Sequence, residues 1–123
     1  MSRVLIVDDN DSIRRLVRKI LERVAFHSDE AHDGVEAIER LKQNKYDAIV
    51  LDLMMPRANG FAVLEFLTTQ QPEALAVTIV LTADSTRWDD PSLSGVAGVV
   101  RKPFAIDELL SAIRVCCGSD QGA

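Results

Sequence analysis

Four apolar segments of the chain each end on a side chain that can bind a cation or a phosphate group. These side chains are Asp8 with Asp9, Asp52, Thr82 and Lys102. Three carboxylates held close together repel one another unless a cation neutralises them, and oxygen ligands favour a hard ion such as Mg2+, with Mn2+ as an alternative. A lysine and a hydroxyl beside that ion would offset the charge of a transferring phosphoryl group. The predicted chemistry is therefore phosphoryl transfer, with Asp52 as the nucleophile.

The segments that precede these side chains are predicted to be strands of one parallel sheet. They are short apolar runs at residues 4–7, 48–51, 76–81 and 98–100. Such runs are typical of strands that helices cover on both faces. The carboxyl ends of parallel strands lie along one edge of the sheet, where ligands bind, so we expect the polar side chains to converge there.

Helical patterns separate these strands. Apolar residues recur with helical spacing over residues 13–24, 35–41, 61–67 and 106–117. Asn10 is placed to cap the first helix, and Asp33, with Glu36 three residues later, is placed to cap the second. Residues 26–31 form a weaker, more polar strand that we expect near a sheet edge. The alternation predicts the α/β class, a doubly wound, five-stranded parallel sheet with helices on both faces.

One segment departs from this regular alternation. Residues 84–95 lack an apolar stripe and contain Pro91, so we expect the fourth helix to be short or irregular. Trp88, the single tryptophan of the chain, lies in this segment. Its position is equally compatible with partner binding and with covering the edge of the core.

Length and composition indicate one small domain. With 123 residues, of which 47% are hydrophobic, the chain can bury one core, which we assign to residues 1–118, followed by a frayed tail at 119–123. The net charge of −5 and the dispersed basic residues argue against direct nucleic-acid binding. No apolar run is long enough for membrane insertion, and the N-terminal run is too short for a signal peptide, so we expect a cytoplasmic protein.

The cysteines and histidines show no pattern of a metal site. Cys116 and Cys117 are adjacent and have no further ligand residue at zinc spacing. His27 and His32 lack a cluster of partners, and we expect both to be solvent-exposed.

Taken in order and spacing, the motifs resemble the receiver domain of the two-component response regulators, of the CheY-like single-domain type, over essentially the whole chain. The resemblance rests on Asp8-Asp9, on Asp52 followed by Met55-Pro56 and Gly60, on Thr82-Ala83 and on Lys102-Pro103-Phe104. It implies a flavodoxin-like sheet of order 2-1-3-4-5. It also implies that a histidine kinase or a phosphotransfer protein phosphorylates Asp52, and that a downstream protein target reads the change. Such a domain catalyses its own phosphorylation and dephosphorylation and is not a conventional enzyme.

The same resemblance implies a role for each site residue. Asp8, Asp9 and Asp52, with the backbone carbonyl of Met54, would hold Mg2+. Lys102 would pair with the phosphoryl oxygens, and Thr82 would turn inward to bond them. Ala83 would leave room above the phosphate, and the bond from Lys102 to Pro103 would be cis.

Two departures from the family pattern affect the switch. Val99 stands where the family usually has a tyrosine or phenylalanine, and Pro91 interrupts the fourth helix. They motivate an alternative function, a degenerate receiver that acts as a phosphorylation-independent docking scaffold.

Two other classes fit the residues less well. A haloacid-dehalogenase-like phosphatase would need a second acid two residues after Asp52, where this chain has Met54. Flavin binding on a flavodoxin-like sheet would need a loop of phosphate donors after the first strand, and residues 8–11 are acidic instead.

Overall fold

Five parallel strands form one sheet in the order β2-β1-β3-β4-β5. The computed structural model of the chain describes residues 2–55, 60–83 and 91–118. The strands are β1 (Arg3–Val7), β2 (His27–Ala31), β3 (Ala48–Asp52), β4 (Thr78–Thr82) and β5 (Gly98–Arg101). The predicted α/β class and the predicted strand order are both confirmed.

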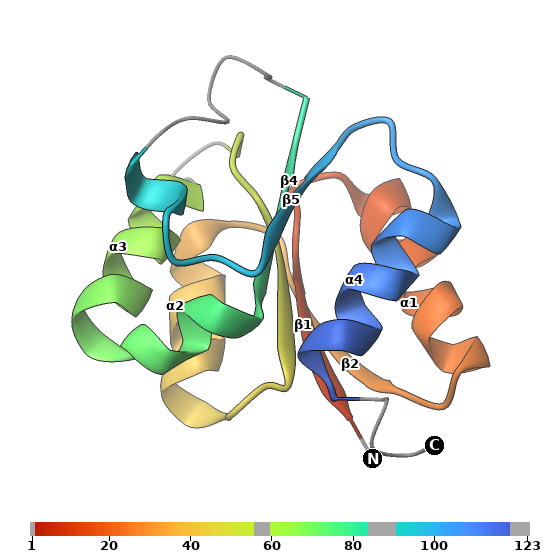
Figure 1. Ribbon diagram of the computed structural model, residues 1–123, viewed down its shortest axis with the longest axis horizontal. Coiled ribbons are helices and arrows are strands. Elements are labelled where there is room, and N and C mark those ends of the chain that lie inside the picture. The colour runs from red at the N-terminus through yellow and green to blue at the C-terminus, as the bar shows by residue number, and fades with distance from the viewer. Residues whose placement is uncertain (1, 56–59, 84–90, 119–123) are drawn as a thin grey trace.

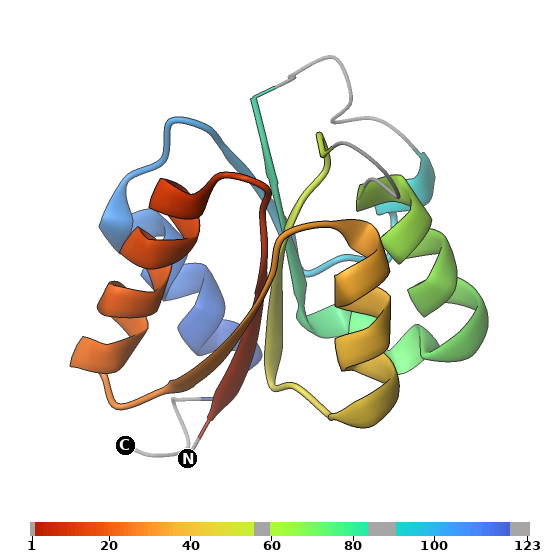
Figure 2. The same cartoon turned by 180° about the vertical axis from the view of Figure 1, so that it is seen from behind.

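Helices cover both faces of the sheet (Figure 1). They are α1 (Asp11–Arg23), α2 (Gly34–Gln43), α3 (Gly60–Gln70) and α4 (Ile106–Cys116), with the 3-10 helices η1 (Pro72–Val77) and η3 (Pro91–Leu93). Helices α1 and α4 lie on one face, and α2 and α3 lie on the other, as the view from behind also shows (Figure 2). In the part of the chain that the structure describes, no helix is both long and apolar enough to cross a membrane.

The core consists of two clusters because successive strand residues point to opposite faces. Leu5 and Val7 pack in the cluster under α2 and α3, whereas Val4 and Ile6 pack in the cluster under α1 and α4. Strand β3 alternates in the same way, and all five of its residues are buried. Burial on both faces explains why the central strands are continuous apolar runs.

The helix caps and the polar strand agree with the sequence patterns. The Asn10 side chain accepts hydrogen bonds from the N–H groups of Ser12 and Ile13 at the start of α1. Asp33 caps α2 by accepting from the Glu36 N–H at 2.8 Å. Strand β2, the most polar strand, is an edge of the sheet. Edge strands with charged side chains resist pairing with a second sheet.

The start of β4 differs from the prediction. The strand begins at Thr78, and the two residues before it close the η1 helix that Pro72 begins. Proline favours the first turn of a helix because its φ angle is already helical. The Thr78 hydroxyl donates to the Ala74 carbonyl at 2.9 Å and so joins this turn to the strand. The predicted start of this strand, at residue 76, is therefore wrong by two residues.

The irregular fourth helix is described only in part. The described portion between β4 and β5 contains the η3 turn, whose Leu93 is buried in the α2–α3 cluster. Residues 84–90, with Trp88, lie outside the described residues, as does the tail expected at 119–123.

Gly60 allows α3 to begin directly against the end of β3. A Cβ atom at this position would lie 2.5 Å from the Asp52 carbonyl oxygen and 2.6 Å from the Leu53 Cα. Because both obstacles are backbone atoms, we expect Gly60→Ala to destabilise the fold by about 1–3 kcal/mol, although alanine is the better helix former. Gly98→Ala is the matched control, because its Cβ would meet nothing within 4 Å. Urea unfolding of both variants tests this, and equal stabilities would contradict it.

Candidate functional site

Asp8 follows β1 and is fixed at every polar atom of its backbone. Its side chain is fully buried, and its N–H donates to the Ala31 carbonyl of β2 at 3.1 Å. Its carbonyl accepts from Arg14 Nη1 at 2.7 Å. Its carboxylate Oδ1 accepts from the Asn10 N–H at 2.9 Å, and its Oδ2 accepts from Lys102 Nζ. The position of this acid is therefore determined by β1, β2 and α1 together.

Asp52 ends β3, beside Asp8. The two strands pair in register up to Val7 and Leu51, so the next residue of each chain segment lies at the same edge. Asp52 is 3% exposed, and its Oδ1 accepts from the Met54 N–H at 3.1 Å. A buried carboxylate therefore lies at the end of the central strand, as the sequence predicts.

Lys102, directly after β5, bridges the two buried acids. Its Nζ lies 3.0 Å from Asp8 Oδ2 and 3.4 Å from Asp52 Oδ2. Burial opposes the charge of Lys102, but the hydrogen bond to Asp8 and the charges of both acids outweigh it and raise the pKa of the ammonium group. The ammonium is thus the internal counter-ion of the carboxylate pair.

The carboxylates of Asp8, Asp9 and Asp52 lie close enough together to hold a cation. One oxygen from each residue lies within 4.8 Å of the others, and Asp9 is exposed while its two neighbours are buried. Three oxygen donors without nitrogen or sulfur suit a hard divalent ion such as Mg2+. The residues therefore fit the metal that the sequence implies. The role of the Met54 carbonyl stays a prediction.

The remaining predicted site residues lie around this centre. Thr82 ends β4 and is fully buried, and Ala83 after it is exposed. The bond from Lys102 to Pro103 is cis, as the resemblance implies. Ala83, Lys102 and Pro103 border an open apolar hollow of about 380 Å³. Their roles in positioning a phosphoryl group stay predictions.

The Val99 side chain points to the face of β5 opposite the cluster under α1 and α4. It pairs with Val80 and packs against the cluster under α2 and α3. Its aliphatic side chain is half-buried there. The effect of valine, in place of an aromatic residue, on the switch stays a prediction.

Burial raises the pKa of the Asp52 carboxyl to about 6, and the neighbouring charge of Asp8 adds to this effect. Lys102 and the Met54 N–H act in the opposite direction. A raised carboxyl pKa means that the folded state binds the proton more tightly, so this contribution to stability is present below about pH 4 and is lost as pH rises through about 6.

We therefore expect Asp52→Asn to stabilise the metal-free protein at neutral pH. The gain over wild type should grow between about pH 4 and pH 6.5 and then level off. Thermal unfolding of both proteins in a chelator, across this pH range, measures the difference. A gain that does not change with pH would contradict the assignment.

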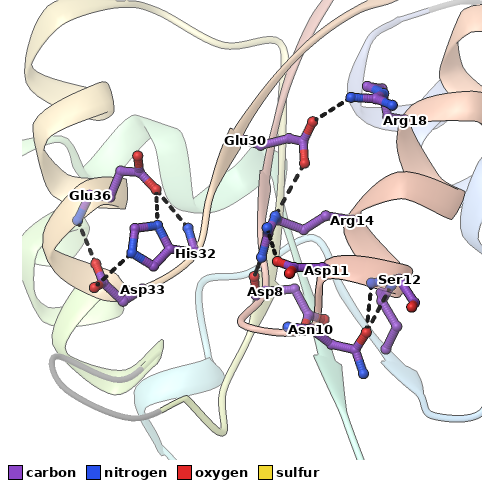
Figure 3. Close-up of polar contacts among 11 residues, drawn as sticks. Asp8, Asn10, Asp11, Ser12, Arg14, Arg18, Glu30, His32, Asp33 and Glu36 are labelled. Carbon is purple, nitrogen blue, oxygen red and sulfur yellow. Dashed lines mark hydrogen bonds and ion pairs between the residues drawn. The ribbon is translucent and has the colours of Figure 1, made fainter.

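Two polar side chains near the site were not identified from the sequence (Figure 3). Arg14 lies on the polar side of the helical pattern at residues 13–24, yet its guanidinium contacts Asp8, Asp11 and Glu30. His32 is exposed, as expected, but its ring contacts Glu36 at 2.6 Å and Asp33 at 3.5 Å. The Glu36 carboxylate also accepts from the His32 N–H, one residue before the expected capping-box donor.

Comparison with known proteins gives one consistent family. The model described as "Response regulator receiver domain" matches residues 4–114 of this chain. Response regulator MprA of Mycobacterium ulcerans is 36% identical over 113 residues, which are 91% of this chain and 48% of that protein. The chain thus spans about half the length of the curated relatives it matches.

Solved structures agree with the sequence matches. A receiver domain of the Francisella response regulator 1452 has a TM-score of 0.86 and 33% identity, covering 98% of this chain and 99% of that one. Response regulator TrrA of Thermotoga maritima, solved in complex with Mg(2+)-BeF, has a TM-score of 0.86 and 32% identity. That match covers 94% of this chain and 99% of that chain.

Proposed function

The chain belongs to the response regulator receiver domain family of two-component systems, and from this premise we propose that it is a switch controlled by phosphorylation of Asp52. The observation that carries the proposal is the buried Asp52 carboxylate, with Asp8 and Lys102 within ion-pair distance of each other at the same sheet edge. A histidine kinase or a phosphotransfer protein would be the donor. A downstream protein would bind the phosphorylated form.

The proposed transfer uses the Asp52 carboxylate as nucleophile. A carboxylate oxygen forms the new bond to phosphorus while the bond from phosphorus to the donor nitrogen breaks, and the leaving imidazole keeps the electron pair. The product is an acyl phosphate. Attack of water on phosphorus later releases inorganic phosphate and regenerates the carboxylate. The chain would catalyse both steps on itself, which differs from a conventional enzyme.

The other residues of the site would balance charge. Bound Mg2+, or Mn2+ in its place, would be held by Asp8, Asp9 and Asp52 and would neutralise part of the charge on the phosphoryl oxygens. Lys102, which already bridges two carboxylates, would pair with the added phosphoryl group. The buried Thr82 hydroxyl would donate to a second phosphoryl oxygen. The complex of the related Thermotoga maritima protein with Mg(2+)-BeF supports this arrangement.

The test is uptake of a phosphoryl group from a small donor. We expect the purified chain, incubated with acetyl phosphate and Mg2+, to gain a phosphate-sized mass, and we expect excess chelator to abolish the gain. Borohydride reduction of the acyl phosphate, followed by peptide mass spectrometry, should locate it at Asp52. A chain that gains no mass with Mg2+ would reject phosphorylation and support the docking scaffold instead. The expected cytoplasmic location is part of this proposal.

A further inference from the structure

Arg14 on the first turn of α1 connects three segments around the acidic loop (Figure 3). Its side chain is only 14% exposed. Nη1 donates to the Asp8 backbone carbonyl at 2.7 Å, Nε donates to Glu30 Oε1 of β2 at 3.1 Å, and Nη2 pairs with the Asp11 carboxylate. Because the guanidinium group is planar and its donors point in fixed directions, it fixes the positions of its three partners relative to one another.

The contact to the Asp8 carbonyl constrains the peptide that joins Asp8 to Asp9. The other backbone group of Asp8, its N–H, is already bonded to the Ala31 carbonyl of β2. Asp9 is exposed, and within residues 2–55, 60–83 and 91–118 its carboxylate has no hydrogen bond or ion pair. The direction of the Asp9 carboxylate therefore depends on the peptide that Arg14 holds.

We propose that Arg14 is a positioning residue for divalent-cation binding, an inference that rests on the proposed function. By holding the Asp8 carbonyl, Arg14 orients the Asp8–Asp9 peptide so that both carboxylates face Asp52. Groups that orient metal ligands in this way typically contribute about 10- to 100-fold to metal affinity.

Charge and positioning make opposite predictions for this residue. Arg14 is a cation that contacts the backbone of Asp8, one of the three proposed ligands, so an effect of charge alone would make its removal strengthen the binding of a divalent cation. Positioning predicts that removal weakens binding. The sign of the change therefore separates the two roles.

Arg18 supplies the matched control. It lies one turn further along α1 and pairs with the same residue, Glu30, at 3.2 Å. Among the described residues it makes no hydrogen bond to Asp8. Arg18→Gln thus removes one positive charge and one ion pair to Glu30, as Arg14→Gln does, but leaves the Asp8 carbonyl bonded to Arg14.

The experiment measures binding of Mn2+ alone, from the electron paramagnetic resonance signal of the free ion. We expect Arg14→Gln to weaken Mn2+ binding by about 10- to 100-fold relative to Arg18→Gln. Arg14→Lys keeps the charge but lacks the planar fork that spans Asp8 and Glu30, and we expect it to weaken binding as well. Circular dichroism and thermal unfolding select the variants that are folded. Mn2+ binding by a folded Arg14 variant as tight as that of Arg18→Gln would overturn the inference, as would a wild type that binds no Mn2+.

Phosphoryl uptake by the same proteins separates this inference from the proposed function. Wild type that binds Mn2+ but gains no phosphate would reject the proposed function, while the affinities would still decide the role of Arg14. Wild type that gains phosphate, with equal affinities in Arg14→Gln and Arg18→Gln, would reject the role of Arg14 and leave the proposed function in place.

Discussion

Asp52→Asn is expected to abolish phosphoryl uptake from acetyl phosphate completely. The amide cannot replace the carboxylate as nucleophile, because its nitrogen lone pair is delocalised and an acyl phosphate cannot form on it. Asn has the same shape as Asp, and the burial of the site favours a neutral group, so the fold should remain intact. Intact-mass spectrometry after incubation with Mg2+ and the donor measures the result.

Asp107→Asn is the matched control for this substitution. Asp107 lies in the first turn of α4 and is exposed, so its replacement removes the same charge away from the site. We expect it to gain the phosphate-sized mass at the wild-type rate. A gain of equal size in Asp52→Asn would show that another residue accepts the phosphoryl group and would reject the assignment.

Lys102→Met is expected to lower the free energy of unfolding substantially. The substitution leaves Asp8 and Asp52 buried without their counter-ion. Removing one partner of a buried pair typically costs 3–5 kcal/mol, and since the Lys102 side chain is 17% exposed we expect about 3 kcal/mol. Urea unfolding at pH 7 without divalent ions measures this cost. Phosphoryl uptake should also slow, by roughly 100-fold, because the group that balances the developing charge is gone.

Lys42→Met is the control that separates loss of the counter-ion from a general effect of replacing a lysine. Lys42→Met, at an exposed position of α2, should change stability by less than about 0.5 kcal/mol. Without Lys102 the pKa of Asp52 rises further, so the cost should shrink as pH falls and Asp52 takes up a proton. Adding Asp52→Asn to Lys102→Met should recover part of the stability. A cost that neither low pH nor Asp52→Asn reduces would contradict the counter-ion role.

The sheet and the convergence of the site were predictable because both follow from local rules. Uninterrupted apolar runs such as residues 48–51 occur where a strand is covered on both faces. The side chain that follows each run must then lie at the carboxyl edge of the sheet. These two rules place Asp8, Asp52 and Lys102 together, although the chain separates them widely.

Other features depend on contacts that the sequence pattern does not show. Residues 76 and 77 continue the apolar run of β4, but Pro72 and the Thr78 hydroxyl favour a helical turn before the strand. Arg14 lies on the polar side of a helical pattern, and its long side chain reaches back to the Asp8 carbonyl. Arginine on the polar side of a helix is usually exposed, so the sequence pattern does not predict the contact between Arg14 and the Asp8 carbonyl.

The span of the Lys102–Asp8 contact has a consequence for how the protein acquires its function during folding. The two residues are 94 positions apart, and β5 follows the other four strands of the sheet along the chain. Contacts of such long range must pay a loop-closure entropy before they stabilise the fold, so we expect this contact to form late. A chain in which β5 has not yet paired with β4 therefore holds two acids without their counter-ion, and we expect it not to accept a phosphoryl group. The rate at which refolding chains become able to accept phosphate would then report the pairing of β5 with β4, a step that helix content alone does not follow.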